Sequence, residues 1–283
     1  MQARVLDLEV VGSCRISPGF QRVTLQPVDA AAELDDSGFD QWFRMFFAPP
    51  GRELHPPYGP VEGWYQRLRA MPEEDAPHIR NYTIRARRRV GRSWQIDVDF
   101  VLHGTGGEAG GAPADGRQAS EPTGGHRGGD YTAAAWAVDA RPGDRIAFLD
   151  QGPLFRPEPG PQLIVTDPTG IPGLEAIVRT LARTPQYGGW AVRAIAEVDD
   201  EADVRELACV DVEWVLRHPD QAPGGAALEA LRSADVDAGV RAYITGESDF
   251  VLTARADLRE RGVPKSAIDF CGYWRRGKKA TDE

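Results

Sequence analysis

The chain has 283 residues, 41% of them hydrophobic and 27% charged, which is enough for two modest globular domains. Its net charge of −10 argues against binding to nucleic acid, whose phosphates need a cationic surface. No apolar run approaches the roughly 18 to 20 residues of a membrane helix. The charged N-terminus, Met1–Glu9, is unlike a signal peptide. We therefore expect a cytoplasmic monomer without membrane insertion.

The first half predicts β-structure. Apolar and polar residues alternate as in strands, and Pro56–Pro60 interrupts any regular element. No periodic helices separate the strands, so we expect an antiparallel barrel or sandwich. The expected strands are 4–12, 20–26, 42–48, 81–87, 94–102 and 144–149.

A glycine-rich segment, 105–130, is almost free of bulky apolar residues. It cannot bury enough surface to offset the entropy of ordering it. We expect a disordered or mobile loop inserted in the first domain. We interpret it as a tolerated surface insertion. The alternative is a lid over a site.

The pattern changes near residue 160, where short apolar runs begin to alternate with helical spacing. This predicts a parallel sheet covered by helices, with a ligand crevice at the carboxyl ends of its strands. We place one domain at 1–158 and the other at 159–283. The expected strands are 162–167, 190–198, 211–216, 242–246 and 267–274, and the expected helices are 174–182, 201–208, 226–233 and 249–261.

Cysteine and histidine do not form a metal motif. Cys14, Cys209 and Cys271 lie far apart, and the five histidines are scattered without a ligand spacing. We expect no disulfide framework, no iron–sulfur cluster and no protein-bound metal.

Two stretches, Arg80–Arg85 and Asp99–Gly104, carry charged and hydroxyl residues at alternate positions of a strand. Residues two apart share a face, so Arg80 and Tyr82 can offer a guanidinium to a phosphate and a ring for stacking. Thr83 points the other way unless the strand bends. These groups suit a flavin, but on spacing alone an ordinary amphipathic strand is the simpler explanation.

The motif Arg-x-Tyr-Thr-x-Arg at 80–85, followed by Asp-Phe-Val-Leu-His-Gly at 99–104, resembles the flavin-binding signature of the siderophore-interacting proteins. These form a branch of the ferredoxin–NADP reductase superfamily. The similarity extends over nearly the whole chain and includes Trp42, which stands where the family usually has His. The other matching segments are Phe20–Leu25, Asp40–Phe47, Ala134–Ala137, Tyr243–Glu247 and Gly272–Lys278.

The resemblance implies an antiparallel β-barrel that binds FAD, followed by a parallel, Rossmann-like α/β domain that binds NADPH or NADH. Arg80 would contact the FAD diphosphate. Tyr82 would stack on the isoalloxazine and Thr83 would hydrogen-bond near N5, which makes these two the catalytic residues. The other implied FAD-binding residues are Arg85, Asp99, Val101, His103, Gly104, Ala135 and Trp136.

One of these positions has an alternative role, and one further residue is expected at the site. His103 can instead cap a strand end. The family's Gly-Pro-Ala-Ser turn is replaced here by Tyr131-Thr-Ala-Ala, so we expect Thr132 to substitute for the missing serine.

The donor side departs further from the family, which usually has Gly-Asp-Glu-Thr-Ala-x-Pro-Ala where this chain has Thr-Asp-Pro-Thr-Gly-Ile-Pro-Gly, 166–173. Backbone N–H groups at this helix start can still meet a diphosphate. Pro168 removes a carboxylate and an N–H, and a helix cap at Thr169 is an equal alternative. NADPH, NADH and ferredoxin all stay open as donors. The implied donor-binding residues are Thr166, Asp167, Thr169, Gly246 and Glu247.

The end of the chain is basic, although the protein is acidic. We expect Arg275, Arg276 and Lys278 to contact an anionic ferric siderophore, and Lys279 to belong to a solvated tail. Tyr273 or Trp274 can cover the flavin or belong to the core.

The function implied by the resemblance is FAD-dependent reduction of a ferric siderophore by NAD(P)H, from Fe(III) to Fe(II), which releases iron in the cytoplasm. A flavin can bridge a two-electron donor and a one-electron acceptor. Two alternatives remain. One is a flavin or ferredoxin-type reductase with another acceptor, and the other is a non-catalytic siderophore-binding protein that handles iron.

Overall fold

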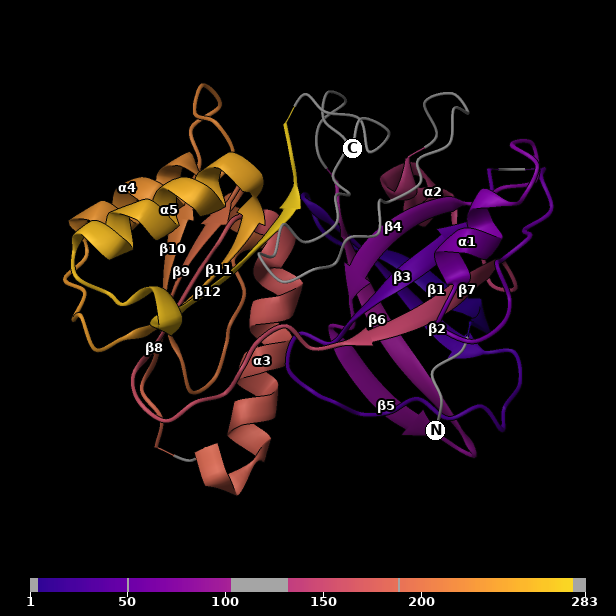
Figure 1. Cartoon of the computed structure of the whole chain (residues 1–283), viewed down its shortest axis with the longest axis horizontal. Coiled ribbons are helices and arrows are strands. Elements are labelled where there is room, and N and C mark those ends of the chain that lie inside the picture. The colour runs from indigo at the N-terminus through magenta and orange to yellow at the C-terminus, as the bar shows by residue number, and fades with distance from the viewer. Residues whose placement is uncertain (1–4, 50, 103–131, 188, 277–283) are drawn as a thin grey trace.

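The computed structural model describes residues 5–49, 51–102, 132–187 and 189–276. They form two sheets that lie side by side, with a long helix, α3 (Ile171–Arg183), between them (Figure 1). The N-terminal sheet is antiparallel and the C-terminal sheet is parallel, as predicted. The glycine-rich segment 105–130 lies outside the described residues.

In the described part of the chain the antiparallel sheet has seven strands, in the order β4-β3-β7-β1-β2-β6-β5. Alternate side chains of these strands, such as Val23, Ile96 and Phe100, fill a fully buried core. The bounds are β1 (Leu6–Ser17), β2 (Phe20–Pro27), β3 (Trp42–Phe47), β4 (His78–Thr83), β5 (Ala86–Val90), β6 (Ser93–Val101) and β7 (Arg145–Gly152), with short helices α1 (Trp64–Arg69) and α2 (Ala133–Asp139).

The expected strand 81–87 is wrong as a single element, because the chain changes partner in its middle. Ile84 N donates to Gln41 O beside β3 at 2.8 Å, and Arg85 N donates to Asp97 O of β6 at 3.0 Å. The two edges of the sheet are thereby brought together, which gives the predicted barrel-like closure. The Arg80–Arg85 motif therefore spans the end of β4 and the crossing to β5.

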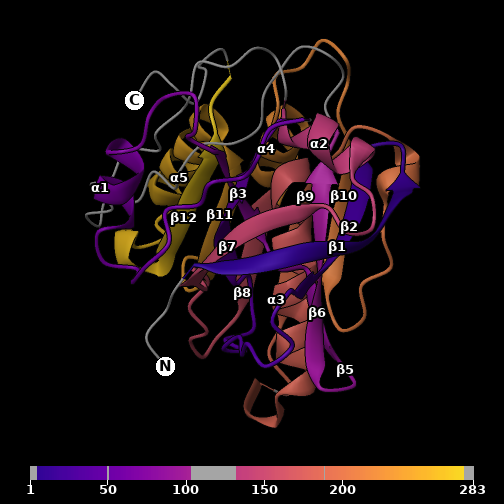
Figure 2. The same ribbon diagram turned by 90° about the vertical axis from the view of Figure 1, so that its right-hand side faces the viewer.

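The parallel sheet has five strands in the order β10-β9-β8-β11-β12 within the described residues. Helix α3 covers the face toward the antiparallel sheet, and α4 and α5 cover the other face (Figures 1 and 2). The bounds are β8 (Gln162–Thr166), β9 (Val192–Val198), β10 (Asp211–Leu216), β11 (Arg241–Glu247), β12 (Ile268–Trp274), α4 (Gly225–Ser233) and α5 (Ser248–Glu260).

The expected helix 201–208 is also wrong. Only a three-residue turn, Glu201–Asp203, forms, and Cys209 adopts a positive φ of 65°. The Arg205 side chain is drawn across to the antiparallel sheet, where it donates to Asp99 at 2.8 Å. This tertiary contact outweighs the local preference for a helix.

A buried ion cluster joins the two sheets. Asp99 of β6 accepts both nitrogens of Arg22 of β2, at 2.7 and 2.8 Å, and one nitrogen of Arg205. Glu175 of α3 accepts from Arg85 and Arg205. The two carboxylate side chains are only 0% and 2% exposed. Burial opposes ionisation of Asp99, but hydrogen bonds and charges from Arg22 and Arg205 outweigh it and lower the Asp99 pKa.

A second polar contact joins the two halves near the start of α3, where Asp40 lies beside Gly173. Buried Asp40 accepts hydrogen bonds from the hydroxyl of Tyr243 on β11 and from the backbone N–H groups of Leu154 and Phe155, the latter two at 3.1 and 2.8 Å.

None of the described helices has the length and apolar character that a membrane crossing needs.

The cluster leads to a stability prediction for Asp99→Asn. The change leaves three arginines facing one carboxylate, so we expect the free energy of unfolding to fall by about 3–5 kcal/mol. Urea unfolding followed by circular dichroism measures this loss. The control Glu33→Gln breaks an exposed pair with Arg89 and should leave the midpoint unchanged.

The same experiment with Glu175→Gln beside it separates this role from the flavin contact expected of Asp99. Glu175 belongs to the same cluster, so we expect FAD to enlarge the loss by the same amount in both variants. An FAD-dependent loss that is larger in Asp99→Asn alone would place that carboxylate on the cofactor.

Candidate flavin and donor site

The free edge of β4 presents two of the predicted flavin residues on one face. In the described part of the chain β4 pairs only with β3. Tyr82 packs its ring 4.2 Å from Phe100, measured between ring centroids, and burial raises its pKa above the ordinary value. Arg80, two residues earlier, shares this face and donates to the carbonyl of Ile79 at 2.7 Å. An aromatic ring and a guanidinium thus lie along one strand edge.

Thr83 lies on the opposite face of β4 from Tyr82. It is directly paired with Trp42 at the start of β3, which also faces Gly152 of β7. Directly opposed residues of an antiparallel pair project to the same side. The side chains of Thr83 and Trp42 therefore project from the same face of the sheet, which is opposite to the face that carries the Tyr82 ring.

Asp99 and Arg85 are engaged elsewhere. Their charged groups are taken up by the ion cluster with Arg22, Arg205 and Glu175, so their expected contact with a flavin stays a prediction. Val101 closes β6 opposite Phe20 and packs at the apolar contact between the sheets. The remaining strand residues of the motif, His103 and Gly104, lie outside the described residues.

Helix α2 positions three further predicted residues. Thr132 is its N-cap and accepts the backbone N–H of Ala135 at 3.1 Å. The Trp136 ring lies 5.8 Å from Phe100 between centroids. Tyr82, Phe100 and Trp136 consequently form a continuous aromatic series from β4 to α2.

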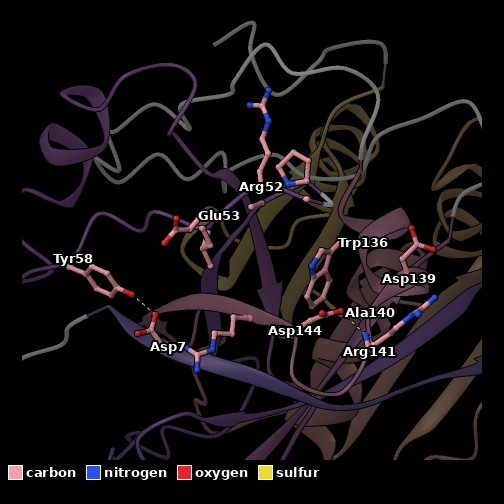
Figure 3. A pocket seen from close by; sticks show the side chains of 14 residues that line it. Asp7, Arg52, Glu53, Tyr58, Trp136, Asp139, Ala140, Arg141 and Asp144 are labelled. Carbon is pink, nitrogen blue, oxygen red and sulfur yellow. Dashed lines mark hydrogen bonds between the residues drawn. The ribbon is translucent and has the colours of Figure 1, made fainter.

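A pocket of about 730 Å³ opens beside Trp136 (Figure 3). Four carboxylates and three guanidiniums around it nearly cancel, so its walls do not select an anion. Its position at the end of the aromatic series makes it a candidate for a neutral or zwitterionic part of a ligand. The lining residues are Asp7, Ala48, Pro49, Gly51, Arg52, Glu53, Leu54, Tyr58, Trp136, Asp139, Ala140, Arg141, Asp144 and Arg145.

The predicted donor residues meet at the carboxyl ends of β8 and β11, but they bind one another. Asp167 accepts from Thr169 N at 2.8 Å, Glu247 N at 2.7 Å and Trp274 Nε1 at 3.0 Å, and also from the Thr169 hydroxyl. The Thr166 hydroxyl lies 3.0 Å from that of Thr245. Asp167, rather than Thr169, caps the turn Pro168–Gly170.

Gly246 and Glu247 complete this closed arrangement. Gly246 has a φ of 139°, and a Cβ there would lie 2.5 Å from the Asp167 carboxyl carbon, so no other residue fits. Glu247 caps α5 by accepting the N–H groups of Asp249 and Phe250 at 2.7 and 3.0 Å. The side chains expected to hold a donor are therefore satisfied within the protein.

Glu197 is a buried residue of this edge that sequence reasoning missed. It lies near the end of β9 and accepts the N–H groups of Gly224, Ala226 and Ala227 at 2.8, 2.9 and 3.2 Å, where α4 begins. Burial raises its pKa to about 7. A lone carboxylate in the apolar run 190–198 was the available signal. It occupies helix amides that a dinucleotide phosphate would otherwise use.

Arg275 and Arg276 of the basic C-terminal segment are exposed. Arg275 pairs with Asp249 at 3.1 Å, and Arg276 N donates to Glu247 at 3.1 Å, while Lys278 lies outside the described residues. Trp274 is a core residue through its bond to Asp167.

Glu197 leads to a pH prediction. Its pKa is raised from the ordinary 4.5 to about 7 in the folded protein, so its contribution to stability is full below pH 4.5 and lost as pH rises through 7. The variant Glu197→Gln mimics the neutral acid and cannot ionise. Between about pH 5.5 and 8.5 the free energy of unfolding of the wild type should therefore fall by about 2 kcal/mol more than that of the variant. Urea unfolding at several pH values measures this, and parallel curves for the two proteins would contradict it.

Comparison with known proteins assigns both halves of the chain. Residues 9–121 match the model of the siderophore-interacting FAD-binding domain, and residues 160–277 match that of the siderophore-interacting protein. The chain is 26% identical over 211 residues to the ferric vibriobactin reductase ViuB of Vibrio cholerae, which covers 72% of this chain and 67% of ViuB.

Solved structures agree in fold. The siderophore-interacting protein SipS from Aeromonas hydrophila is 23% identical with a TM-score of 0.69, over 98% of this chain and 94% of SipS. A siderophore utilization protein from T. fusca is 27% identical with a TM-score of 0.67, over 100% of this chain and 97% of that one. The Amycolatopsis cytochrome P450 reductase GcoB, at 17% identity, has a TM-score of 0.59 over 96% and 71%. With an FAD-binding domain, a reductase-like fold and the Arg-x-Tyr-Thr-x-Arg motif at its strand edge, the chain belongs to the siderophore-interacting protein family.

Proposed function

We propose that this protein reduces Fe(III) held by a siderophore to Fe(II), with FAD as cofactor and NADPH or NADH as electron donor. The observation that carries the proposal is the free edge of β4. It offers Arg80 and Tyr82 on one face and Thr83 on the other, at the boundary between the two sheets. Arg85, two residues beyond, binds Glu175 of α3 and so places this edge against the parallel half. The ferric vibriobactin reductase relative supports the choice of reaction.

The groups at this edge fit an FAD. Tyr82 supplies a flat ring, Arg80 a cation for the diphosphate, and Thr83 a hydroxyl for the polar edge of the isoalloxazine. The buried indole N–H of Trp42, beside Thr83, has no acceptor among the described residues. When bound, FAD would accept electrons as a pair and release them singly, which suits a nicotinamide donor and an iron acceptor.

We assign one ligand-binding role to each half of the chain. Residues 1–158 form the FAD-binding unit, and 159–283 form the donor-binding unit. Around the cofactor we retain a group of residues with backbone or packing roles: Val101, His103, Gly104, Thr132, Ala135 and Trp136. Arg85 and Asp99 act instead through the ion cluster, which positions the end of β4.

The iron needs no ligand from the protein, because the siderophore supplies all its oxygens. The exposed guanidiniums of Arg275 and Arg276, with Lys278, would attract an anionic siderophore toward the flavin edge. Arg275 pairs with exposed Asp249, a contact that solvent screens and a ligand can replace.

The donor is proposed from the fold, since Asp167, Thr169 and Glu247 are already engaged with other groups of the protein. A nicotinamide would therefore rely on main-chain groups and on the shape of the crevice. Reduced ferredoxin is the alternative donor. We place the protein in the cytoplasm as a monomer.

The functional test is anaerobic. FAD-loaded protein is mixed with a ferric catecholate siderophore and an Fe(II)-specific chromogenic chelator, and NADPH, NADH or reduced ferredoxin is then added. We expect Fe(II) to accumulate with at least one donor. Arg275→Ala/Arg276→Ala should raise KM several-fold with kcat unchanged, and the effect should shrink at high salt. The control Arg232→Ala, in an exposed pair with Asp257, should behave as the wild type.

Each alternative has its own outcome. Donor oxidation with other acceptors but no Fe(II) would indicate a reductase of another specificity. A protein that stays colourless after addition of FAD, yet binds the siderophore, would indicate a non-catalytic iron-handling role.

A further inference from the structure

Trp42 occupies a position at which its side chain faces the proposed flavin site. It begins β3 and lies directly opposite Thr83, the residue proposed to contact the cofactor near N5. Opposed residues in an antiparallel pair have Cβ atoms about 4.5–5.5 Å apart and share a face. On its other side Trp42 faces Gly152, which has no side chain to compete for that space. The indole and the Thr83 hydroxyl are thus neighbours at the same strand end.

The indole N–H of Trp42 is buried and has no hydrogen-bond acceptor among the residues that the structure describes. A buried donor without a partner destabilises the protein, because it loses its hydrogen bond to water and gains none in return. Two other buried indoles, those of Trp94 and Trp274, have an acceptor within the protein. Trp94 Nε1 donates to Ala32 O at 2.8 Å, and Trp274 Nε1 donates to Asp167 at 3.0 Å. Trp42 therefore departs from the usual pattern at the one place where a cofactor is proposed.

The position of the Trp42 ring does not depend on its N–H. The guanidinium carbon of Arg44, two residues further along β3, lies 5.4 Å from the Trp42 ring centre and 4.7 Å from that of Trp64. These cation–π contacts hold the indole from the strand side. The ring is fixed by packing, and its donor is left available for a ligand.

We propose that Trp42 Nε1–H donates a hydrogen bond to a pyrimidine carbonyl oxygen of the flavin, beside Thr83, and thereby positions the ring and tunes its potential. This inference rests on the proposed function, because it needs FAD at the β4 edge. The isoalloxazine offers carbonyl acceptors along its pyrimidine side, and Trp is a donor only. A hydrogen bond there favours the electron-rich, reduced ring, so it makes the reduction potential more positive.

The test compares Trp42→Phe, which removes the donor and keeps an aromatic ring, with Trp42→His, which restores a donor and matches the residue usual in the family. In Trp42→Phe we expect the Kd for FAD to rise about three- to tenfold, as for the loss of one hydrogen bond. The reduction potential of the bound flavin should become more negative. Trp42→His should recover both quantities toward wild type. Trp190→Phe, whose ring packs on Tyr187 in the parallel half, is the matched control and should change neither.

A second readout does not depend on a folded variant. The indole ¹H–¹⁵N resonance of Trp42 in the wild type should move downfield and exchange more slowly with solvent when FAD is added. An unmoved resonance, with an unchanged Kd in Trp42→Phe, would overturn the inference while leaving the proposed function intact. Failure of the wild type to bind FAD at all would overturn the proposed function itself.

Discussion

The structure depends on one buried set of charges between its two sheets. Asp99 and Glu175 are inaccessible to water and share three arginines, two from the antiparallel half and one from the parallel half. Removing either carboxylate would leave buried cations uncompensated, so the arrangement is stable only as a whole. The cluster includes Arg85, two residues beyond Thr83. It therefore fixes where the end of β4 lies relative to α3, and with it the geometry of the proposed flavin edge.

The flavin side and the donor side of the proposed site differ in how far their polar side chains are hydrogen-bonded within the protein. The β4 edge carries an aromatic ring, a guanidinium and a hydroxyl, and the indole N–H of Trp42 beside it has no acceptor among the described residues. At the ends of β8 and β11, Asp167 and Glu247 bind the protein's own amides and the indole of Trp274. The flavin half thus contains a buried indole N–H without an acceptor among the described residues, whereas the donor-side carboxylates already accept hydrogen bonds from the protein. This asymmetry suits a protein that keeps its cofactor and meets its donor only transiently.

Local pattern sufficed where a residue's environment is set by its neighbours in sequence. The alternation in β2, β3 and β6 and the apolar runs of the parallel strands predicted both sheets. The errors come from contacts between distant residues. The strand 81–87 divides where Arg85 pairs with Asp97, and the helix 201–208 fails where Arg205 reaches Asp99, 106 positions away in the chain. For the same reason the motif could not show the three arginines that surround Asp99, whose expected contact with a flavin stays a prediction. The unpartnered N–H of Trp42 is visible only once β3 and β4 are paired.

The central claim is that a flavin bound between these sheets delivers single electrons to siderophore iron. The most direct test loads the protein with FAD, reduces it with one equivalent of dithionite under anaerobic conditions, and mixes it with excess ferric siderophore and an Fe(II) chelator. One reduced flavin holds two electrons, so we predict about two Fe(II) per FAD in a single turnover, with return of the oxidised flavin spectrum. A flavin that stays reduced while no Fe(II) appears would contradict the account.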